Sequence, residues 1–105
     1  MAFKRRLTSK IQIANNFKDG NGYIRAYPIL NGETEMFGKG RMYSYMILEK
    51  DCEIGQHTHQ GDCETFIVIK GHGKYLLNGA LGDVGPGDVL SCGNGEEHYM
   101  INEND

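Results

Sequence analysis

Short turn signals divide the C-terminal half of this 105-residue chain at close, regular intervals. They are Gly71-His72-Gly73, Asn78-Gly79, Gly85-Pro86-Gly87 and Gly93-Asn94-Gly95. The runs between them are short and rich in β-branched and aromatic residues, which favour strands. No stretch between residues 23 and 102 keeps the 3.6-residue period of an amphipathic helix. Short strands with turns about every 8–12 residues predict an all-β, antiparallel sandwich or barrel.

The composition agrees with one all-β domain. A chain of this length buries a single core, and its 15 glycines and only 2 prolines suit frequent tight turns. The formal net charge is -3 with both signs interspersed, so nothing indicates nucleic acid or a membrane as partner. The 3 cysteines are an odd number without CxxC spacing, which argues against a disulfide framework and predicts a cytoplasmic protein.

The turn signals also set the expected strand boundaries. We expect residues 1–22 to form an N-terminal arm or edge strand and residues 23–105 to form the barrel. The expected strands cover 23–30, 41–49, 57–59, 64–70, 74–77, 80–84, 88–92 and 98–101. Pro28 favours an edge position for the first of them, because proline cannot donate to a strand ladder. Residues 50–55 are expected to turn, and residues 71–73 and 78–79 are interpreted as hairpin turns.

One cluster in the middle of the chain has the spacing of metal ligands. His57 and His59 are two residues apart, so on a strand their side chains share a face. A turn can bring Glu64 back beside them on the next strand. Two imidazoles and a carboxylate that converge on one point form a candidate divalent-metal site. His98, far down the chain, is a candidate fourth ligand.

These residues resemble the cupin family. His57-Thr58-His59, four residues, Glu64, six residues and Gly71 match its first motif without a gap. The second motif is represented by a set that departs at one position, where Gly93 stands for a proline: Gly87, Gly93, Gly95, His98 and Asn102. The resemblance covers residues 41–102 and implies a jelly-roll barrel, an antiparallel double-stranded β-helix with the metal inside.

The resemblance also implies the ligand set and the kind of ion. By position, the metal ligands of the family correspond to His57, His59, Glu64 and His98. Three imidazoles and one carboxylate leave one or two positions open on a five- or six-coordinate divalent transition metal. Mn, Fe, Ni, Co, Cu and Zn all remain open, because geometry and metal supply decide among them.

The expected strand over 64–70 predicts an inner and an outer face. If Glu64 points inward, Phe66 and Val68 also point inward and form an apolar wall beside the metal. Ile67 and Ile69 then face outward, which predicts that the N-terminal segment or a second subunit covers them. Cupin barrels continue with closing strands after the second motif, so we expect an open edge after Ile101. Either the N-terminal arm supplies the missing edge, by exchange in a homodimer, or the sequence stops short of the full barrel.

Residues that could act on a substrate are less clearly marked. Tyr43, Tyr45 and Arg41 are weak catalytic candidates, the tyrosines as proton carriers and the arginine as an anion clamp. Tyr99 is expected to face away from the metal because it is adjacent to His98. The expectations for the remaining polar and sulfur residues are structural: buried packing thiols at Cys52, Cys63 and Cys92, a loop cap at Asp62, structural roles for Gln56 and Asn102, and an exposed side chain at His72.

Three kinds of function remain open at this point. The first is a metal-dependent enzyme that acts on a small, polar, oxygen-rich molecule. It would resemble the small cupins that are isomerases, tautomerases or lyases of sugars and uronates. The second is a cupin dioxygenase, which would need Fe, Ni or Cu. The third is a non-catalytic, metal-supported module that binds or senses a small molecule. Metal analysis and an oxygen-consumption screen would separate the first two.

Overall fold

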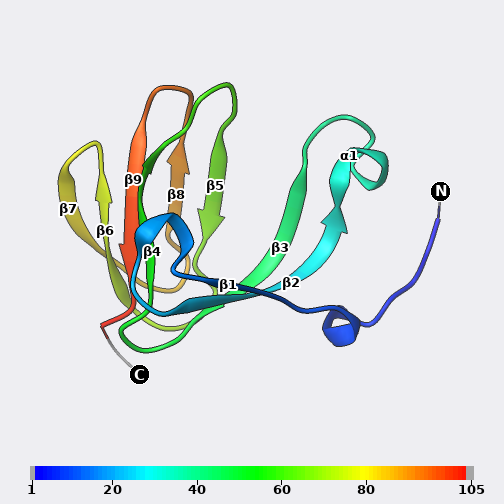
Figure 1. Ribbon diagram of the computed structural model, residues 1–105, viewed down its shortest axis with the longest axis horizontal. Helices are drawn as coiled ribbons and strands as arrows, with labels where there is room; N and C mark the ends of the chain where they lie inside the picture. Colours follow the sequence, from blue (N-terminus) through cyan, green and yellow to red (C-terminus); the bar gives the residue numbers. More distant parts are fainter. Residues whose placement is uncertain (1, 104–105) are drawn as a thin grey trace.

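The structure, a computed structural model, describes residues 2–103, and most of its regular elements are strands (Figure 1). The nine strands are β1 Gln12–Asn15, β2 Tyr23–Asn31, β3 Met42–Leu48, β4 Glu53–Thr58, β5 Glu64–Ile67, β6 Gly73–Leu77, β7 Ala80–Val84, β8 Val89–Cys92 and β9 Glu97–Ile101. The helical elements are the short η1 Leu7–Ser9, η2 Phe17–Asp19 and α1 Gly32–Glu35. None of the described helices has the length and apolar character needed to cross a membrane.

The strands form an antiparallel jelly roll, as expected. One sheet has the order β4-β9-β6-β7, a second pairs β5 with β8, and a third has the order β1-β2-β3. Figure 1 shows β4 to β9 standing together as the barrel, with the long β2–β3 hairpin leaning away from it. Asn78 and Gly79 both have positive φ and join Leu77 to Ala80, so the predicted hairpin turn is confirmed.

Several local predictions were wrong for identifiable reasons. Residues 71–73 do not form a hairpin, because β5 pairs with β8 while β6 lies in the other sheet. The predicted turn over 50–55 contains the start of β4, whose ladder with β9 begins at Glu53 opposite Ile101. The expected open edge after Ile101 is absent, because β9 lies between β4 and β6. Glycines and charged residues in the sequence indicate where the chain turns, but they do not determine which strand pairs with which.

The first sheet places Pro28 where a proline can be tolerated. β1 pairs with β2 only from Tyr23 to Ala26, so beyond that point β3 is the only strand paired with β2 among the described residues. Pro28 lies in this edge segment, next to a shift of register in the β2–β3 ladder. Because β1 does not pair with β2 at Pro28, the missing N–H of the proline breaks no hydrogen bond between these two strands.

The core lies between the sheets and is made mostly of small and branched side chains. Its buried apolar members are Ile24, Ala26, Cys52, Ile54, Val84, Leu90 and Cys92. On β5 the exposure alternates, with Glu64 and Phe66 turned inward and Thr65 and Ile67 outward, as the strand period predicts. His98 is the one buried polar residue in the described part of the chain, at 4% exposure. A buried imidazole needs partners, and these lie in the site described next.

Candidate metal centre

Three elements from two sheets bring the four predicted ligands together. His57 is on β4 directly opposite His98 on β9, and His59 follows one residue after the end of β4. Glu64 is the first residue of β5. One nitrogen or oxygen atom from each of the four side chains lies within 4.8 Å of the other three. The sequence spacing therefore identified a real spatial cluster, including the distant His98.

The separations within the cluster fit a single ion. The Nε2 atom of His98 lies 3.0 Å from Nε2 of His57 and 3.0 Å from Nε2 of His59. Oε1 of Glu64 lies 3.3 Å from Nε2 of His98 and 3.4 Å from Nε2 of His59. Ligand atoms about 2.1 Å from a metal, at right angles to each other, are about 3.0 Å apart. The four side chains can hold a divalent metal ion.

The hydrogen bonds of His57 and His59 also indicate a cation site. Nδ1 of His57 lies 2.8 Å from the Gly55 carbonyl oxygen, and Nδ1 of His59 lies 2.8 Å from Oδ1 of Asp62. Both partners are acceptors, so each Nδ1 must carry the proton, and in the neutral ring each Nε2 presents a lone pair. Two lone pairs and the Glu64 carboxylate thus face one small volume. Such a donor set is matched by a cation.

Burial and charge keep these groups in the forms that bind metals. Burial lowers the pKa of His57, and the neighbouring His98 and His59 lower it further, which favours the neutral ring. Burial opposes ionisation of Glu64, but the contact with His98 and the field of the imidazoles outweigh it and hold its pKa below the ordinary value. Neutral imidazoles beside an ionised carboxylate are the states required for coordination.

Asp62 has a role that the sequence did not reveal. It was expected to cap a loop, but its Oδ1 accepts from His59 while its Oδ2 accepts from the Arg41 guanidinium. The hydrogen bond from His59 lowers the pKa of Asp62. A carboxylate behind a metal-binding histidine fixes its tautomer and ring orientation. The only signal was the three-residue spacing of His59 and Asp62, which loops often show for other reasons.

The two motif loops are tied to each other. The His59 amide donates to the Glu96 carbonyl, and the Gly95 amide donates to the His59 carbonyl. The Gly61 amide donates to Oδ1 of Asn94 at 2.7 Å. The Gly93 amide donates to Oε1 of Glu96, a bond that the proline of the family motif could not make. These bonds anchor the loop that carries His59 to the loop that precedes His98.

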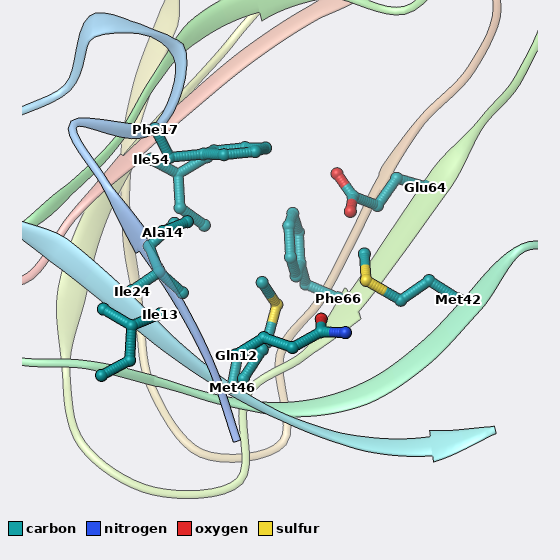
Figure 2. A pocket seen from close by; sticks show the side chains of 11 residues that line it. Gln12, Ile13, Ala14, Phe17, Ile24, Met42, Met46, Ile54, Glu64 and Phe66 are labelled. Atoms are coloured by element: carbon teal, nitrogen blue, oxygen red, sulfur yellow. The ribbon is translucent and has the colours of Figure 1, made fainter. Parts of the chain in front are cut away.

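A cavity of about 140 Å³ adjoins the cluster (Figure 2). Glu64 and Phe66 of β5 line one side of it, and side chains of β1, η2, β2, β3 and β4 line the rest. The Phe17 ring meets His57 edge-on, and the Phe66 ring lies 5.6 Å from His98. The cavity walls therefore touch the histidines, and a molecule in the cavity would lie next to a bound ion.

The weak catalytic candidates lie elsewhere. Tyr43 and Tyr45 are exposed on β3, where the neighbouring Met42 and Met46 line the cavity. Arg41 is exposed and pairs with Asp62. None of the three residues lines the cavity, and their catalytic role stays a prediction.

Most of the remaining expectations, for Asn102, Tyr99 and the cysteines, are confirmed, and one is wrong. The Asn102 amide donates to the Leu48 carbonyl, and Tyr99 turns away from the cluster to donate to Glu53. Cys52 and Cys92 are buried as predicted, whereas Cys63 is exposed and not the buried thiol expected. Cys63 lies in the loop before β5, outside the strand whose alternation was used to place it.

Comparison with known proteins assigns the family. A family model described as "Cupin domain" matches residues 44–105, more than half of the chain. The chain belongs to the cupin superfamily. Over 88 residues this cupin is 30% identical to the oxalate-binding protein of Thermotoga maritima, covering 84% of this chain and 72% of that protein. It also resembles the crystal structure of a protein described as a predicted oxalate decarboxylase from T. maritima. That match has a TM-score of 0.89 and 25% identity over 96% of this chain and 88% of the other.

Proposed function

We propose that this cupin binds one divalent transition-metal ion through His57, His59, Glu64 and His98 and uses it to hold a small carboxylate such as oxalate. The convergence of lone pairs and a carboxylate on one point is the observation that carries the metal site. The name of the T. maritima relative supports oxalate as the ligand. A bound divalent ion supplies positive charge that attracts and polarises a carboxylate oxygen.

The adjoining cavity supports a small acid over a sugar. Its volume of about 140 Å³ is below the ~300–1,000 Å³ of ordinary ligand pockets. Its walls are mostly apolar, formed by residues such as Met46, Ile54 and Phe66. A sugar or uronate presents many hydroxyl groups, and each would lose hydrogen bonds against such walls. This weakens the isomerase and tautomerase forms of the first hypothesis.

The same lining favours binding over turnover. Decarboxylation of oxalate would break the carbon–carbon bond, release CO₂ and add a proton to the remaining carbon. That step needs a proton donor, and Glu64 is the only titratable side chain among the described residues that line the cavity. Because Glu64 is assigned to the metal, we favour a non-catalytic binding module. A lyase of the decarboxylase type is the second candidate, supported by the description of the structural relative.

The test begins with the metal. Purified protein is analysed for bound metals, and the Mn²⁺-loaded protein is titrated with oxalate by calorimetry. We expect one ion per chain and saturable oxalate binding that disappears when the ion is chelated. A double variant with His57→Ala and His59→Ala should lose both, whereas stoichiometric metal in that variant would refute the site. Release of CO₂ from oxalate would favour the lyase, and consumption of oxygen would favour a dioxygenase.

We also propose that the protein is a cytoplasmic homodimer. Three reduced thiols are compatible with that compartment. The side chains of Ile67 and Val89 are 63% and 60% exposed on the outer face of β5–β8, and Ile69, just beyond β5, is 66% exposed. The described N-terminal segment does not cover them, since η1 and β1 pack against β2. A second copy is the occupant that fits an uncovered apolar face of this kind.

A further inference from the structure

One polar side chain in the cavity lining is not explained by the metal. Apart from Glu64 and Gln12, the described lining residues are all apolar: Ile13, Ala14, Phe17, Ile24, Ala26, Met42, Met46, Ile54 and Phe66. Gln12 comes from β1, far from both cupin motifs. In Figure 2 its amide points into the space around Phe66 from the end opposite the Glu64 carboxylate.

The placement of Gln12 follows from the β1–β2 ladder. Gln12 pairs with Ala26, and Ala14 pairs with Ile24. Ala26 and Ile24 are buried and line the cavity, so this face of β1 is turned toward the inside of the barrel. The Gln12 amide makes no hydrogen bond with any residue in the described part of the chain. Gln12 is an exposed residue at the edge of the cavity, so its two N–H donors and its carbonyl oxygen are open both to solvent and to a ligand at that end.

We propose that Gln12 is a specificity-determining residue that binds the end of the ligand remote from the metal. The inference rests on the proposed function, in which the metal holds one carboxylate beside Glu64. A ligand that also carries oxygen at its other end finds an N–H donor at Gln12. The site thus selects short two-ended acids, of the oxalate or oxamate class, over acids with one polar end.

The walls and the charge of the cavity set the limits of this selection. Among the described lining residues only Gln12 and Glu64 have polar side chains, so a longer diacid would place its second carboxylate against methionine, isoleucine or phenylalanine side chains. No lysine or arginine is among the described lining residues. The remote end of the ligand therefore meets a neutral amide. This amide can donate an N–H to a carboxylate or, after rotation by about 180°, accept an N–H from a carboxamide.

The experiment compares three ligands on the Mn²⁺-loaded full chain. Oxalate, oxamate and acetate are titrated by calorimetry into wild type, Gln12→Leu and Gln12→Glu. Chelator competition checks that each variant binds Mn²⁺ as wild type does. Gln12→Leu should weaken the affinity for oxalate about tenfold, which corresponds to the loss of one hydrogen bond to a charged group. The affinity for acetate should stay within twofold of wild type. Gln12→Glu should reverse the preference, because its carboxylate repels oxalate but accepts the N–H of oxamate.

A matched control and two outcomes complete the test. Gln56→Leu removes a second exposed glutamine, one that does not line the cavity, and it should leave all three affinities unchanged. If wild type binds oxalate but Gln12→Leu weakens oxalate and acetate equally, or neither, the inference is overturned while the proposed function stands. If metal-loaded wild type binds no oxalate, both are overturned.

Discussion

The Asp62 carboxylate lies between the Arg41 guanidinium and the Nδ1 atom of His59. Loss of such a carboxylate behind a metal-binding histidine typically weakens metal affinity by about 10–100-fold. We therefore expect Asp62→Ala to lower Mn²⁺ affinity within that range, measured by competition with a fluorescent chelator. Asp62→Asn keeps an acceptor oxygen and should lose less. Equal affinities in wild type and Asp62→Ala would show that His59 needs no support.

Gly55 holds the His57 ring in place and packs tightly against η2. Its carbonyl accepts from His57, and a Cβ built on it would lie only 1.9 Å from the Lys18 carbonyl oxygen. A side chain here must push η2 away from β4, and overpacking of this kind typically costs about 1–3 kcal/mol. We expect Gly55→Ala to be destabilised by that amount in urea unfolding. At Gly40 a Cβ meets only the end of the Met36 side chain, so Gly40→Ala should be nearly neutral.

At the scale of elements, the hydrogen bond between Tyr99 and Glu53 links β9 to β4 in addition to the ladder. Tyr99 donates to Glu53, whose carboxylate also accepts from the Asn21 amide at 2.6 Å. The bond lowers the pKa of Glu53, while burial and then the bond to Glu53 raise the pKa of Tyr99 to about 12. Tyr99→Phe should cost about 1–2 kcal/mol at neutral pH. Tyr75→Phe is the control, because the Tyr75 hydroxyl has no hydrogen bond among the described residues.

The sign of the pH dependence follows from the two shifts. A lowered pKa at Glu53 gives stability above its unfolded value of about 4.3, and this is lost as the pH falls through the folded value. A raised pKa at Tyr99 gives stability below its unfolded value of about 10, which is lost as the pH rises through about 12. The gap between wild type and Tyr99→Phe should therefore be widest near neutral pH and shrink in acid. A gap that stays constant down to about pH 3 would contradict this assignment.

The elements also show what a sequence can predict and why. The period of two along β5 placed Glu64 and Phe66 inside and Ile67 outside, because alternation depends only on local strand geometry. The partner of β5 could not be read in this way, since pairing with β8 is decided by packing across the barrel. Gln12 was missed for a related reason. Nothing near it in the sequence marks a site, and only the β1–β2 register turns it toward the cavity.

At the scale of the whole molecule, we expect the outer face of β5–β8 to form the contact of the proposed dimer. Ile67 lies opposite Val89 in the ladder, and both side chains are exposed. In a two-fold dimer each substitution acts twice, and each buried apolar side chain contributes about 1.5–3 kcal/mol. Light scattering should give wild type a mass of twice 11.8 kDa.

The variants then test whether this face forms the interface. Because each introduced lysine would place a charge in the contact, Ile67→Lys and Val89→Lys should each give a monomer. Leu81 on β7 is equally exposed, at 68%, but belongs to the other sheet. Leu81→Lys should therefore keep the dimer mass. A monomeric wild type would refute the dimer and leave the face of Ile67 and Val89 for another partner. Dissociation by Leu81→Lys alone would place the dimer contact on the other sheet.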